Sequence, residues 1–252
     1  MQNYQPNDNF LKDKIILVTG ATDGIGKEAA LSYAKYGATV ILLSRDTRKL
    51  EKVYDQIEEL GYPKPAYLPV NLQDNTPETY QKVAEVIDEE FGRLDGLLHN
   101  AGDLGLLSPI EHFDDETWFR VMQVNVNAQF LLTKYCIPLL KQSESSSLVF
   151  TSSGVGRKGR AYWGAYAVSK FANEGLMQVL ADELENSVIR VNSINPGATR
   201  TKMRANAYPG EDPQALPTAQ DIIPAYLWLM DSASEETNGQ AINARDFMKV
   251  AK

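Results

Sequence analysis

The stretch Thr19-Gly20-Ala21-Thr22-Asp23-Gly24-Ile25-Gly26 decides the fold that we expect for the whole chain. It directly follows the apolar run Lys14–Thr19 and opens a helical pattern over Ile25–Tyr36. Glycines at such a junction let the backbone turn sharply and approach a pyrophosphate, and the helix N-terminus offers free N–H groups to that anion. Since the chain has 17 glycines in 252 residues, chance predicts roughly 0.004 copies of Thr-Gly-x-x-x-Gly-x-Gly. The stretch therefore predicts a dinucleotide-binding loop rather than a ligand-free turn.

Short apolar runs and longer helical patterns alternate along the rest of the chain. The further strand candidates are Ala38–Ser44, Ala66–Val70, Leu94–His99, Ser147–Thr151 and Val188–Asn192. The further helical patterns are Asp46–Leu60, Pro77–Phe91, Asp115–Lys141 and Trp163–Glu185. Continuous apolar strands separated by helices of this length are typical of a parallel sheet that helices cover on both faces. We therefore expect the α/β class, and a chain of this length can form one domain.

Composition and charge exclude several classes of protein. With 25 Lys+Arg against 33 Asp+Glu, the net charge of −8 argues against a general binder of nucleic-acid backbones, which needs a basic face. Hydrophobic residues at 43% and charged residues at 23% are typical of a folded domain. No apolar run approaches the ~18 residues of a membrane helix. The polar N-terminus does not resemble a signal peptide. We therefore expect neither nucleic acid nor a membrane as a partner.

The single cysteine and the two histidines limit the chemistry. Cys136 alone cannot form an internal disulfide, which fits a reducing cytoplasm. With His99 and His112 as the only histidines, a histidine-based hydrolytic triad or a His/Cys zinc site is poorly supplied. We therefore expect a cytoplasmic protein without a bound metal. Of two short low-complexity segments, Ser143–Ser147 is expected to be a solvated turn, and Tyr208–Pro217 follows a strand end, where ligands bind in open α/β sheets.

A second motif, Tyr166-Ala-Val-Ser-Lys170, places a phenol and an amine on one helix face. Taken alone it is weak, because a helical tyrosine is more often a core or rim residue. Neighbouring motifs strengthen it. Ser152-Ser153 ends a strand candidate upstream, Asn100-Ala101-Gly102 follows the strand before that, and Asn125 lies in the helix between them.

Together with Thr19–Gly26 and Pro196-Gly197, these residues resemble the short-chain dehydrogenase/reductase family, in matching order from about residue 12 to residue 243. Three stretches are similar to the YciK-type oxidoreductases of bacteria: Met122–Asn127, Leu148–Ser153 and Trp163–Phe171. The resemblance implies a single-domain Rossmann fold, with a doubly wound parallel sheet of about seven strands. It also implies an oxidoreductase that interconverts a carbonyl compound and its alcohol.

The resemblance implies a catalytic tetrad of Asn125, Ser153, Tyr166 and Lys170. Tyr166 would donate a proton to the carbonyl oxygen in reduction, or remove one from the alcohol in oxidation. Ser153 would hold the substrate oxygen, Lys170 would bind the ribose, and Asn125 would hold a water that returns the proton. Because the pKa of free tyrosine is about 10, too high for a base at neutral pH, we expect the Lys170 ammonium and the positive charge of an oxidised nicotinamide to lower the pKa of Tyr166.

The resemblance also implies which residues contact the cofactor: Gly20, Thr22, Asp23, Gly24, Ile25, Gly26, Ser44, Arg45, Asn71, Leu72, Asn100, Ala101, Gly102, Tyr166, Lys170, Pro196, Gly197, Thr199 and Thr201. Two positions depart from the commonest pattern of the family. His99 replaces an asparagine, and we expect a packed, hydrogen-bonded residue there more than an added catalyst. Asn71 replaces an aspartate but keeps a carbonyl that can accept from the adenine amino group.

Arg45 indicates which dinucleotide binds. It stands with Ser44 at the end of the second strand, where an acid selects NAD and an arginine accommodates the 2′-phosphate of NADP. Alternatively, Arg45 is a solvated residue beside Asp46, which would cap the next helix. Asp23 argues against NADP, since relatives that prefer it often carry Lys or Arg there. We expect NADP(H) to be preferred, with NAD(H) possible.

The sequence is least informative about the substrate pocket. Six residues fall near its expected walls and favour an apolar carbonyl compound, unless they belong to the core or to a subunit interface: Leu104, Leu106, Leu107, Val155, Trp163 and Met203. Residues 199–217 are expected to form a substrate lid. By the same resemblance, a homodimer or homotetramer would form through Asp115–Lys141 and Trp163–Glu185.

Several functions compete on this fold. An NADP(H)-dependent oxidoreductase is favoured, with an NAD-dependent alcohol dehydrogenase as its nearest variant. A non-catalytic NAD(P)-binding regulator predicts a damaged tetrad, yet all four positions are filled. A nucleotide-sugar epimerase usually has a larger C-terminal region, and a methyltransferase usually needs an acid where Arg45 stands.

Overall fold

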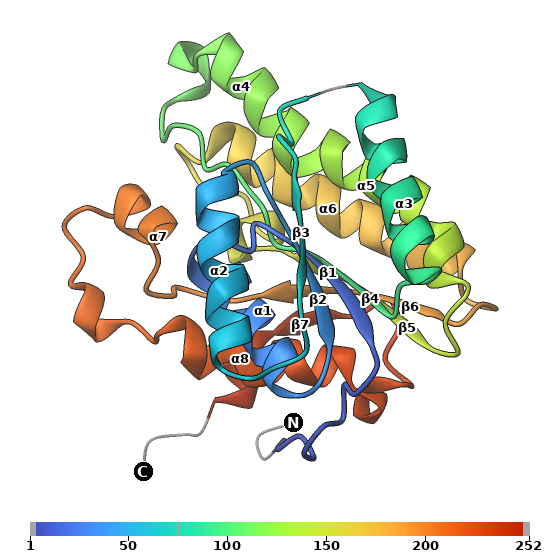
Figure 1. Cartoon of the computed structure of the whole chain (residues 1–252). Coiled ribbons are helices and arrows are strands. Elements are labelled where there is room, and N and C mark those ends of the chain that lie inside the picture. The colour runs from blue at the N-terminus through green and yellow to red at the C-terminus, as the bar shows by residue number, and fades with distance from the viewer. Residues whose placement is uncertain (1–3, 75, 249–252) are drawn as a thin grey trace.

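The computed structural model describes residues 4–74 and 76–248, in which a seven-stranded sheet lies between two layers of helices (Figure 1). The strand order is β3-β2-β1-β4-β5-β6-β7, and every neighbouring pair is parallel. The strands are β1 (Ile15–Thr19), β2 (Thr39–Ser44), β3 (Ala66–Pro69), β4 (Gly96–His99), β5 (Ser146–Thr151), β6 (Ile189–Asn195) and β7 (Ala241–Asn243). The parallel α/β sheet that the sequence predicts is therefore confirmed.

The helices divide between the two faces of the sheet. Figure 1 shows α1, α2 and α8 on one side, and α3, α5 and α6 on the other. The helices are α1 (Gly24–Lys35), α2 (Thr47–Glu59), α3 (Pro77–Phe91), α4 (Asp115–Met122), α5 (Ala128–Leu140), α6 (Gly164–Glu183), α7 (Lys202–Ala207) and α8 (Ala219–Met230). Among the described residues, none of these helices combines the length and the apolar character that crossing a bilayer requires.

Alternate side chains of each central strand enter two separate cores. In β1, Ile16 and Val18 pack with the α1 and α8 side, whereas Leu17 packs with the α3, α5 and α6 side. β5 behaves in the same way, with Val149 in the first core and Phe150 in the second. Because both faces are covered, all of these positions are apolar, which is the continuous pattern in the sequence.

The strand order reverses where β1 lies between β2 and β4. The connection after β1 leads to β2 on one side, and the connection after β4 leads to β5 on the other, so a crevice opens beyond the carboxyl ends of β1 and β4. This is the end of the sheet where the glycine-rich loop follows β1. The fold thus brings the two motifs of the sequence to the same edge.

Several elements differ from the sequence expectation, which assigned neither α7 nor α8. β6 runs to Asn195, three residues beyond the predicted end at Asn192, and β7 had not been assigned. The polar residues at the end of β6 hide the strand in the sequence, but Ser193 finds a partner across the fold and donates to Glu174 at 2.6 Å. The predicted helix Asp115–Lys141 is interrupted by a π-helical turn at Gln123–Asn127.

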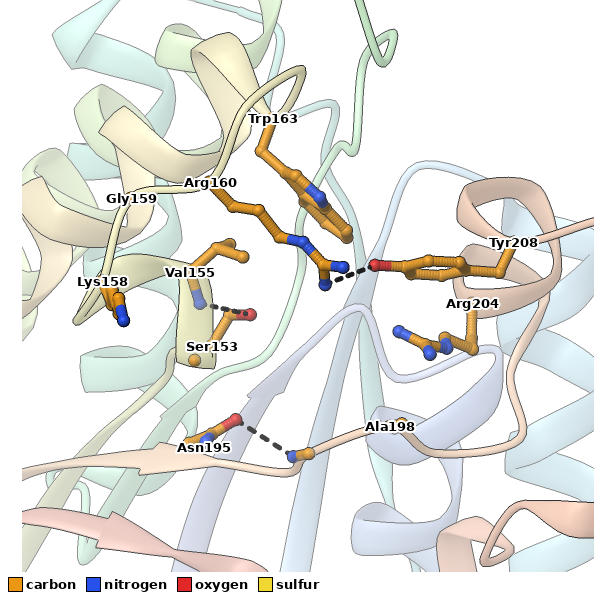
Figure 2. A pocket seen from close by; sticks show the side chains of 12 residues that line it. Ser153, Val155, Lys158, Gly159, Arg160, Trp163, Asn195, Ala198, Arg204 and Tyr208 are labelled. Atoms are coloured by element: carbon orange, nitrogen blue, oxygen red, sulfur yellow. Dashed lines mark hydrogen bonds between the residues drawn. The ribbon is translucent and has the colours of Figure 1, made fainter. Parts of the chain in front are cut away.

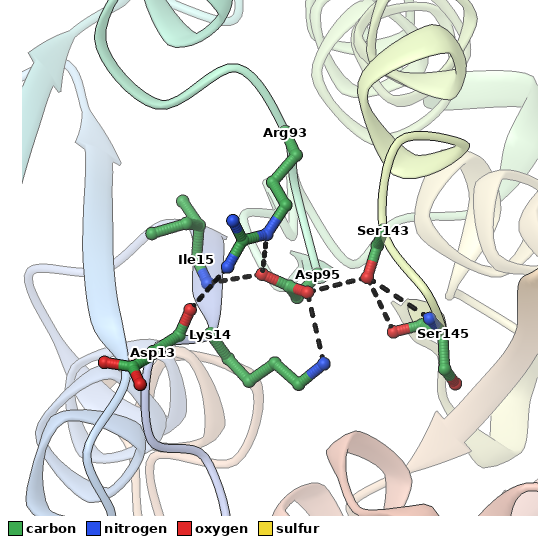
Figure 3. A network of polar contacts seen from close by, with 7 residues as sticks. All are labelled: Asp13, Lys14, Ile15, Arg93, Asp95, Ser143 and Ser145. Atoms are coloured by element: carbon green, nitrogen blue, oxygen red, sulfur yellow. Dashed lines mark hydrogen bonds and ion pairs between the residues drawn. The ribbon is translucent and has the colours of Figure 1, made fainter.

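The serine-rich segment Ser143–Ser147 is only in part the solvated turn that the sequence predicts, because Glu144 and Ser145 are exposed but Ser143, Ser146 and Ser147 are buried. Ser146 and Ser147 belong to β5, and the Ser143 hydroxyl donates to Asp95 Oδ1 at 2.6 Å. Figure 3 shows Asp95 between Ser143, Arg93, Lys14 and the Ile15 amide, at the amino ends of the strands. Ser143 is buried as a donor to this carboxylate, which lies distant in the sequence, whereas the buried Ser147 hydroxyl donates to the Leu229 carbonyl at 2.6 Å.

We expect Asp95→Ala to lower the free energy of unfolding by about 2–4 kcal/mol, since a buried carboxylate with several donors is lost and those donors are left unpaired. Burial raises the pKa of Asp95, but hydrogen bonds from Ser143 and Ile15 and the charges of Lys14 and Arg93 lower it by more. The stabilisation is therefore present above the ordinary aspartate pKa and lost as pH falls through the lowered one.

Urea denaturation measured from pH 7 down to pH 3 checks this expectation. The difference in the free energy of unfolding between native protein and Asp95→Ala should become smaller below about pH 4. Asp88→Ala is the matched control, because Asp88 is exposed on α3 and should change stability by less than about 0.5 kcal/mol. Equal stability of Asp95→Ala and native protein at pH 7 would contradict the role of the network.

Candidate active site

A cavity of about 1180 Å³ opens at the carboxyl ends of the central strands. The residues that directly follow β1, β2, β4, β5 and β6 all line it: Gly20, Arg45, Asn100, Ser152 and Pro196. Of the predicted cofactor-contacting residues, all except Gly26 lie in its walls. Of the predicted tetrad, Ser153, Tyr166 and Lys170 line it and Asn125 does not. The fold therefore gathers residues from positions 20 to 201 around one space.

The glycine-rich loop owes its shape to two close approaches. Gly20 has φ +66°, and a Cβ there would meet Ala101 Cα at 2.9 Å. A Cβ on Gly26 would overlap the Gly20 carbonyl oxygen and the Asn100 side chain. Thr19 Oγ1 accepts from the amides of Asn100 and Ala101, both at 3.0 Å, and fixes the loop against the end of β4. Gly26 thus packs the start of α1 against the loop, which explains why it does not line the cavity.

The N-terminus of α1 faces the cavity with its loop. Asp23 accepts from the Gly24 amide at 2.8 Å, while helical geometry leaves the next amides without intrahelical acceptors. The Lys202 ammonium pairs with Asp23 Oδ2 at 2.9 Å, and this hydrogen bond lowers the pKa of Asp23. The negative charge of Asp23 is therefore matched by a cation from the far side of the cavity.

The end of β2 presents polar groups at the rim of the same cavity. Thr22 Oγ1 and Ser44 Oγ share a hydrogen bond of 3.1 Å, which joins the glycine-rich loop to this strand. Asp46 caps α2 by accepting from the Lys49 amide at 3.2 Å, as the alternative interpretation expected. Arg45 is exposed, and no acid of the described residues forms an ion pair with it. A guanidinium without an acidic partner is thus available at the rim.

Asn71 and Leu72 form the neighbouring part of the wall, after β3. The Asn71 carbonyl oxygen Oδ1 accepts from the Gln73 amide at 3.2 Å, which closes a local turn. Leu72 is buried and packs into the second core. The expected acceptor on Asn71 is therefore present beside an apolar surface, although it already has one donor.

Tyr166, Ser153 and Lys170 converge where β5 ends and α6 begins its first turns. Ser153 hydrogen-bonds Tyr166, and Lys170 Nζ lies 5.6 Å from the centre of the tyrosine ring. The Lys170 ammonium is buried and donates to the Thr151 carbonyl at 2.7 Å. A hydroxyl, a phenol and an ammonium thus share one wall of the cavity, which is a donor set suited to a carbonyl or alcohol oxygen.

Burial dominates the pKa values of these groups. It raises the pKa of Tyr166 to about 12, which hydrogen bonding with Ser153 partly offsets. Burial lowers the pKa of Lys170 to about 8, although the charge of the nearby Glu174 carboxylate has the opposite effect and raises it. The expected lowering of the Tyr166 pKa below 10 is therefore wrong for the protein alone, because desolvation of the phenolate exceeds what its neighbours return. At neutral pH Tyr166 keeps its proton.

Asn125 supports the site from behind rather than facing it. It lies in the π-helical turn, and its Oδ1 accepts from the Asp103 amide at 2.7 Å. Its Nδ2 donates to the Asp103 carbonyl and to Ser169 Oγ, both at 2.9 Å. These bonds tie the loop after β4 to α6, next to Tyr166 and Lys170. A π-turn at such a point is often found at functional sites.

His99 is a packed residue, as the sequence suggests. Its Nε2 shares a hydrogen bond of 2.8 Å with Thr133 Oγ1, and its ring stacks on Phe150 at 4.8 Å between centroids. Burial, with the Lys170 charge, lowers its pKa to about 3, so the imidazole is neutral at physiological pH. Its position inside the core gives it no contact with the cavity.

A second cavity of about 480 Å³ adjoins the first, and Ser153 and Trp163 line both (Figure 2). The expected substrate walls fall in these two spaces, with Val155 in the smaller cavity and Leu104, Leu106, Leu107 and Met203 in the larger. The sequence analysis did not single out Lys158 and Arg160 of the smaller cavity, whereas Arg204 and Tyr208 belong to the segment 199–217 that was predicted as the lid. The run Arg157-Lys158-Gly159-Arg160, placed between a strand end and a helix, was the available signal.

The larger cavity fits a dinucleotide on three structural grounds. Gly20 and Gly24 line the cavity with positive φ angles of +66° and +52° and carry no side chains, so the backbone can approach a pyrophosphate there. The α1 N-terminus supplies amides for an anion. The buried Ser152 hydroxyl, which lines the cavity, has no partner among the described residues. The larger cavity is therefore the candidate cofactor site, and the smaller one extends it on the substrate side.

Comparison with known proteins agrees with this geometry. The profile of the family described as short chain dehydrogenase matches residues 14–212. The chain belongs to the short-chain dehydrogenase/reductase family. As such it is an oxidoreductase, and its sheet is the Rossmann fold of that family.

Individual short-chain dehydrogenases are similar over nearly the whole chain. The uncharacterized oxidoreductase YciK of Escherichia coli K12 is 55% identical over 243 residues, which is 96% of each chain. A short-chain dehydrogenase of Shigella flexneri complexed with NADP is 54% identical, with a TM-score of 0.93 over 95% of this chain and all of that one (100%). One from E. coli CFT073 complexed with NADPH is 55% identical, with a TM-score of 0.93 and the same coverage (95% and 100%). The resemblance to YciK-type oxidoreductases is thus confirmed.

Proposed function

We propose that this protein is an NADP(H)-dependent oxidoreductase that interconverts a small carbonyl compound with an apolar body and its alcohol. The observation that carries the proposal is the convergence of Ser153, Tyr166 and Lys170 in a cavity that is continuous with the glycine-rich loop. The residues at the loop would hold the cofactor, and those after β5 would hold the substrate oxygen.

Tyr166 is the general acid and base of the proposed reaction. With its pKa raised to about 12, it is protonated at neutral pH and can donate to the substrate oxygen during reduction. Ser153 holds that oxygen by a hydrogen bond, and the buried Lys170 ammonium favours the phenolate that remains. When bound, the nicotinamide supplies or accepts the hydride. In oxidation Tyr166 must first lose its proton, so a rising pH favours that direction.

The preference for NADP(H) rests on charge at the rim. Arg45 has no acidic partner among the described residues and can meet a 2′-phosphate with two parallel donors. The electrostatic objection from Asp23 is reduced, because Lys202 pairs with it. The complexes of the Shigella and E. coli relatives with NADP and NADPH support the same choice. NAD(H) binding remains compatible with the rest of the cavity.

Oxidation of NADPH, followed at 340 nm against ketones, aldehydes, quinones and sugars, tests the proposed function. We expect turnover with at least one of these classes and slower turnover when NADH replaces NADPH. Calorimetry should show that NADPH binds. Tight NADPH binding without turnover of any carbonyl class would favour the non-catalytic regulator instead.

We further propose that residues 199–217 close over the bound ligands as a lid on a catalytic core of about residues 12–243. The segment already contacts both sides of the opening. Lys202 pairs with Asp23 of the glycine-rich loop, and Tyr208 accepts from Arg160 Nη1 at 2.9 Å. Protection from limited trypsin digestion at Lys202 and Arg204 on addition of NADPH would support closure, and unchanged digestion would contradict it.

The protein is also proposed to assemble as a homodimer or homotetramer. One face of α6 exposes Val168, Phe171, Gly175 and Val179, which follow each other at helical spacing. Phe119 of α4 is exposed as well, at 70%. Apolar side chains gathered on one helix face are typical of a subunit interface.

We expect Phe171→Asp to convert the oligomer into a monomer, because the substitution places a charge in the apolar face. Sedimentation velocity on native and variant protein measures the change. Leu60→Asp serves as the control, since Leu60 is similarly exposed, at 51% against 45% for Phe171, but lies at the end of α2. A native monomer, or an assembly that Phe171→Asp leaves intact, would refute this interface.

The proposed cellular location is the cytoplasm. Cys136 is a free thiol in the core, and burial raises its pKa to about 12, so it is unreactive and suits a reducing compartment. Recovery of the protein in the cytoplasmic fraction of cells that express it would support this location, and recovery in the membrane pellet would contradict it.

A further inference from the structure

The smaller cavity beside Ser153 carries a charge opposite to that of the whole protein. Lys158, Arg160 and Arg204 line it, and none of its described lining residues is acidic. The whole chain has a net charge of −8. A concave cationic surface concentrates anions from solution. This surface therefore indicates a ligand that is an anion.

Two of the three cations are available to a ligand. Arg204 is neutralised, because its Nε and Nη2 donate to the two carboxylate oxygens of Glu211 at 2.6 and 2.7 Å. Arg160 donates through Nη1 to the Tyr208 hydroxyl at 2.9 Å, a neutral partner. No described acid forms an ion pair with Arg160 or with Lys158, which is exposed. The remaining guanidinium donors of Arg160 and the Lys158 ammonium therefore lack an anionic partner.

Arg157 shows that the local fold distinguishes between these cations. It belongs to the same run, yet its Nε donates to Glu174 at 3.1 Å and its Nη2 to the Ile242 carbonyl at 3.0 Å. Arg157 thus anchors the loop after β5 to α6 and β7. Arg160, three residues later, lies instead above the cavity beside Trp163 and opposite Arg204 in Figure 2. Because Arg157 anchors the loop, Arg160 is left to face the substrate side, while Lys158 lies on the other side of Val155 in Figure 2.

Aromatic surfaces complete the cavity and connect it to the reaction site. Trp163 lies 5.7 Å from the Tyr166 ring and 6.0 Å from the Tyr208 ring, measured between centroids. The Arg204 guanidinium carbon Cζ lies 3.8 Å from the centre of the Tyr208 ring, so the guanidinium stacks on this ring. A ligand that reaches from Ser153 toward Arg160 would pass the Trp163 face. The cavity therefore suits a molecule with an apolar body and a charged end.

We infer that the substrate carries a carboxylate or phosphate group, which Arg160 binds while its carbonyl lies at Ser153 and Tyr166, and that Lys158 adds positive charge to the same cavity. The inference rests on the proposed function for the position of the carbonyl. An arginine can meet either anion with two parallel hydrogen bonds, and the apolar body contacts Trp163. The anion then fixes the orientation of the substrate, which an apolar wall alone does not do.

Binding of matched pairs of carbonyl compounds to the protein in the presence of NADP⁺ tests this inference by calorimetry, without any need for turnover. Phenyl- and alkyl-substituted 2-, 3- and 4-oxo acids are compared with their methyl esters, and dihydroxyacetone phosphate with dihydroxyacetone. We expect at least one charged compound to bind at least ~10-fold more tightly than its neutral partner. This factor is the lower end of what a hydrogen bond to a charged group contributes to affinity. The two arms show whether a carboxylate or a phosphate is preferred.

Variants then assign the preference to residues. Arg160→Gln should reduce the preference for the charged compound at least ~10-fold. The double variant with Lys158→Gln and Arg160→Gln should abolish this preference, while the neutral compounds bind as before. Tyr208→Phe removes the hydrogen bond that holds Arg160 but keeps the charge, so it should retain most of the preference. Lys141→Gln, an exposed cation at the end of α5, should change nothing.

The outcomes separate this inference from the proposed function. Equal binding of charged and neutral partners, binding of no charged member, or a preference that survives in the double variant would each overturn the inference. Preferential binding of an acid that is never reduced would support the anion site and count against the proposed carbonyl reduction. Reduction of neutral ketones alone, without any preference for anions, would support the proposed carbonyl reduction and count against the anion site.

Discussion

We expect Tyr166→Phe to lower the rate of the chemical step by at least ~10²-fold, the lower value for loss of a general acid or base. The phenol is the proposed proton donor and interacts with Ser153, and the substitution removes its hydroxyl while keeping the buried ring. The ring contact with Trp163 should persist, so the affinity for NADPH should change little. Single-turnover oxidation of NADPH measures the chemical step, and calorimetry measures the affinity.

Tyr162→Phe is the matched control for this prediction. Tyr162 precedes α6, is 61% exposed and does not line either cavity, so its hydroxyl should not matter for turnover. Near-native turnover by Tyr166→Phe with any substrate would show that another group supplies the proton. Loss of NADPH affinity together with turnover would point to a structural role of the hydroxyl instead.

Arg45→Asp should weaken NADPH binding by more than ~10-fold. This is the lower end of the roughly 10- to 150-fold effect that is expected when a hydrogen bond to a charged group is lost. The 2′-phosphate of NADPH, with about −1.5 to −2 charges, loses its guanidinium partner in this variant and is repelled by the introduced carboxylate. NADH lacks this phosphate, so its affinity should change much less. Added salt should weaken the native affinity for NADPH more than that for NADH, because exposed charge pairs are screened.

Arg48→Asp makes the same change in charge one helical turn further along. Arg48 is exposed on α2 and does not line the cavity, so NADPH binding should stay near the native value. Fluorescence titrations with both dinucleotides compare the three proteins. Equal native affinities for NADPH and NADH, unchanged by Arg45→Asp, would assign Arg45 to the solvated surface and favour NAD as the cofactor.

The parts of the fold with local sequence signals were predictable. The central strands are apolar because both faces are covered, and the turn after β1 needs glycine because Ala101 and Asn100 approach it closely. β7 and the end of β6 lacked such a signal, since Ser193 and its neighbours are polar in sequence and find partners only in the folded chain. The buried serines before β5 were misinterpreted for the same reason.

The candidate site shows the same division. Residues in recognisable motifs, such as Gly20 and Tyr166, lie in the predicted cavity. The pKa of Tyr166 could not be predicted, because it depends on how deeply the fold buries the ring. The roles of Arg157 and Arg160 could not be separated either, since Glu174 and Tyr208, which lie elsewhere in the sequence, decide which cation is anchored to an acid.

The most direct test of the proposed reaction follows the hydride itself. NADPH that carries deuterium at both C4 positions of the nicotinamide is supplied with a carbonyl compound found by the screen, and mass spectrometry locates the label in the product. We expect deuterium on the carbinol carbon with native protein and, at the same time point, about 1% of that amount or less with Tyr166→Phe. Absence of deuterium from every carbonyl product, with NADPH bound, would contradict a hydride-transferring site between the glycine-rich loop and Tyr166.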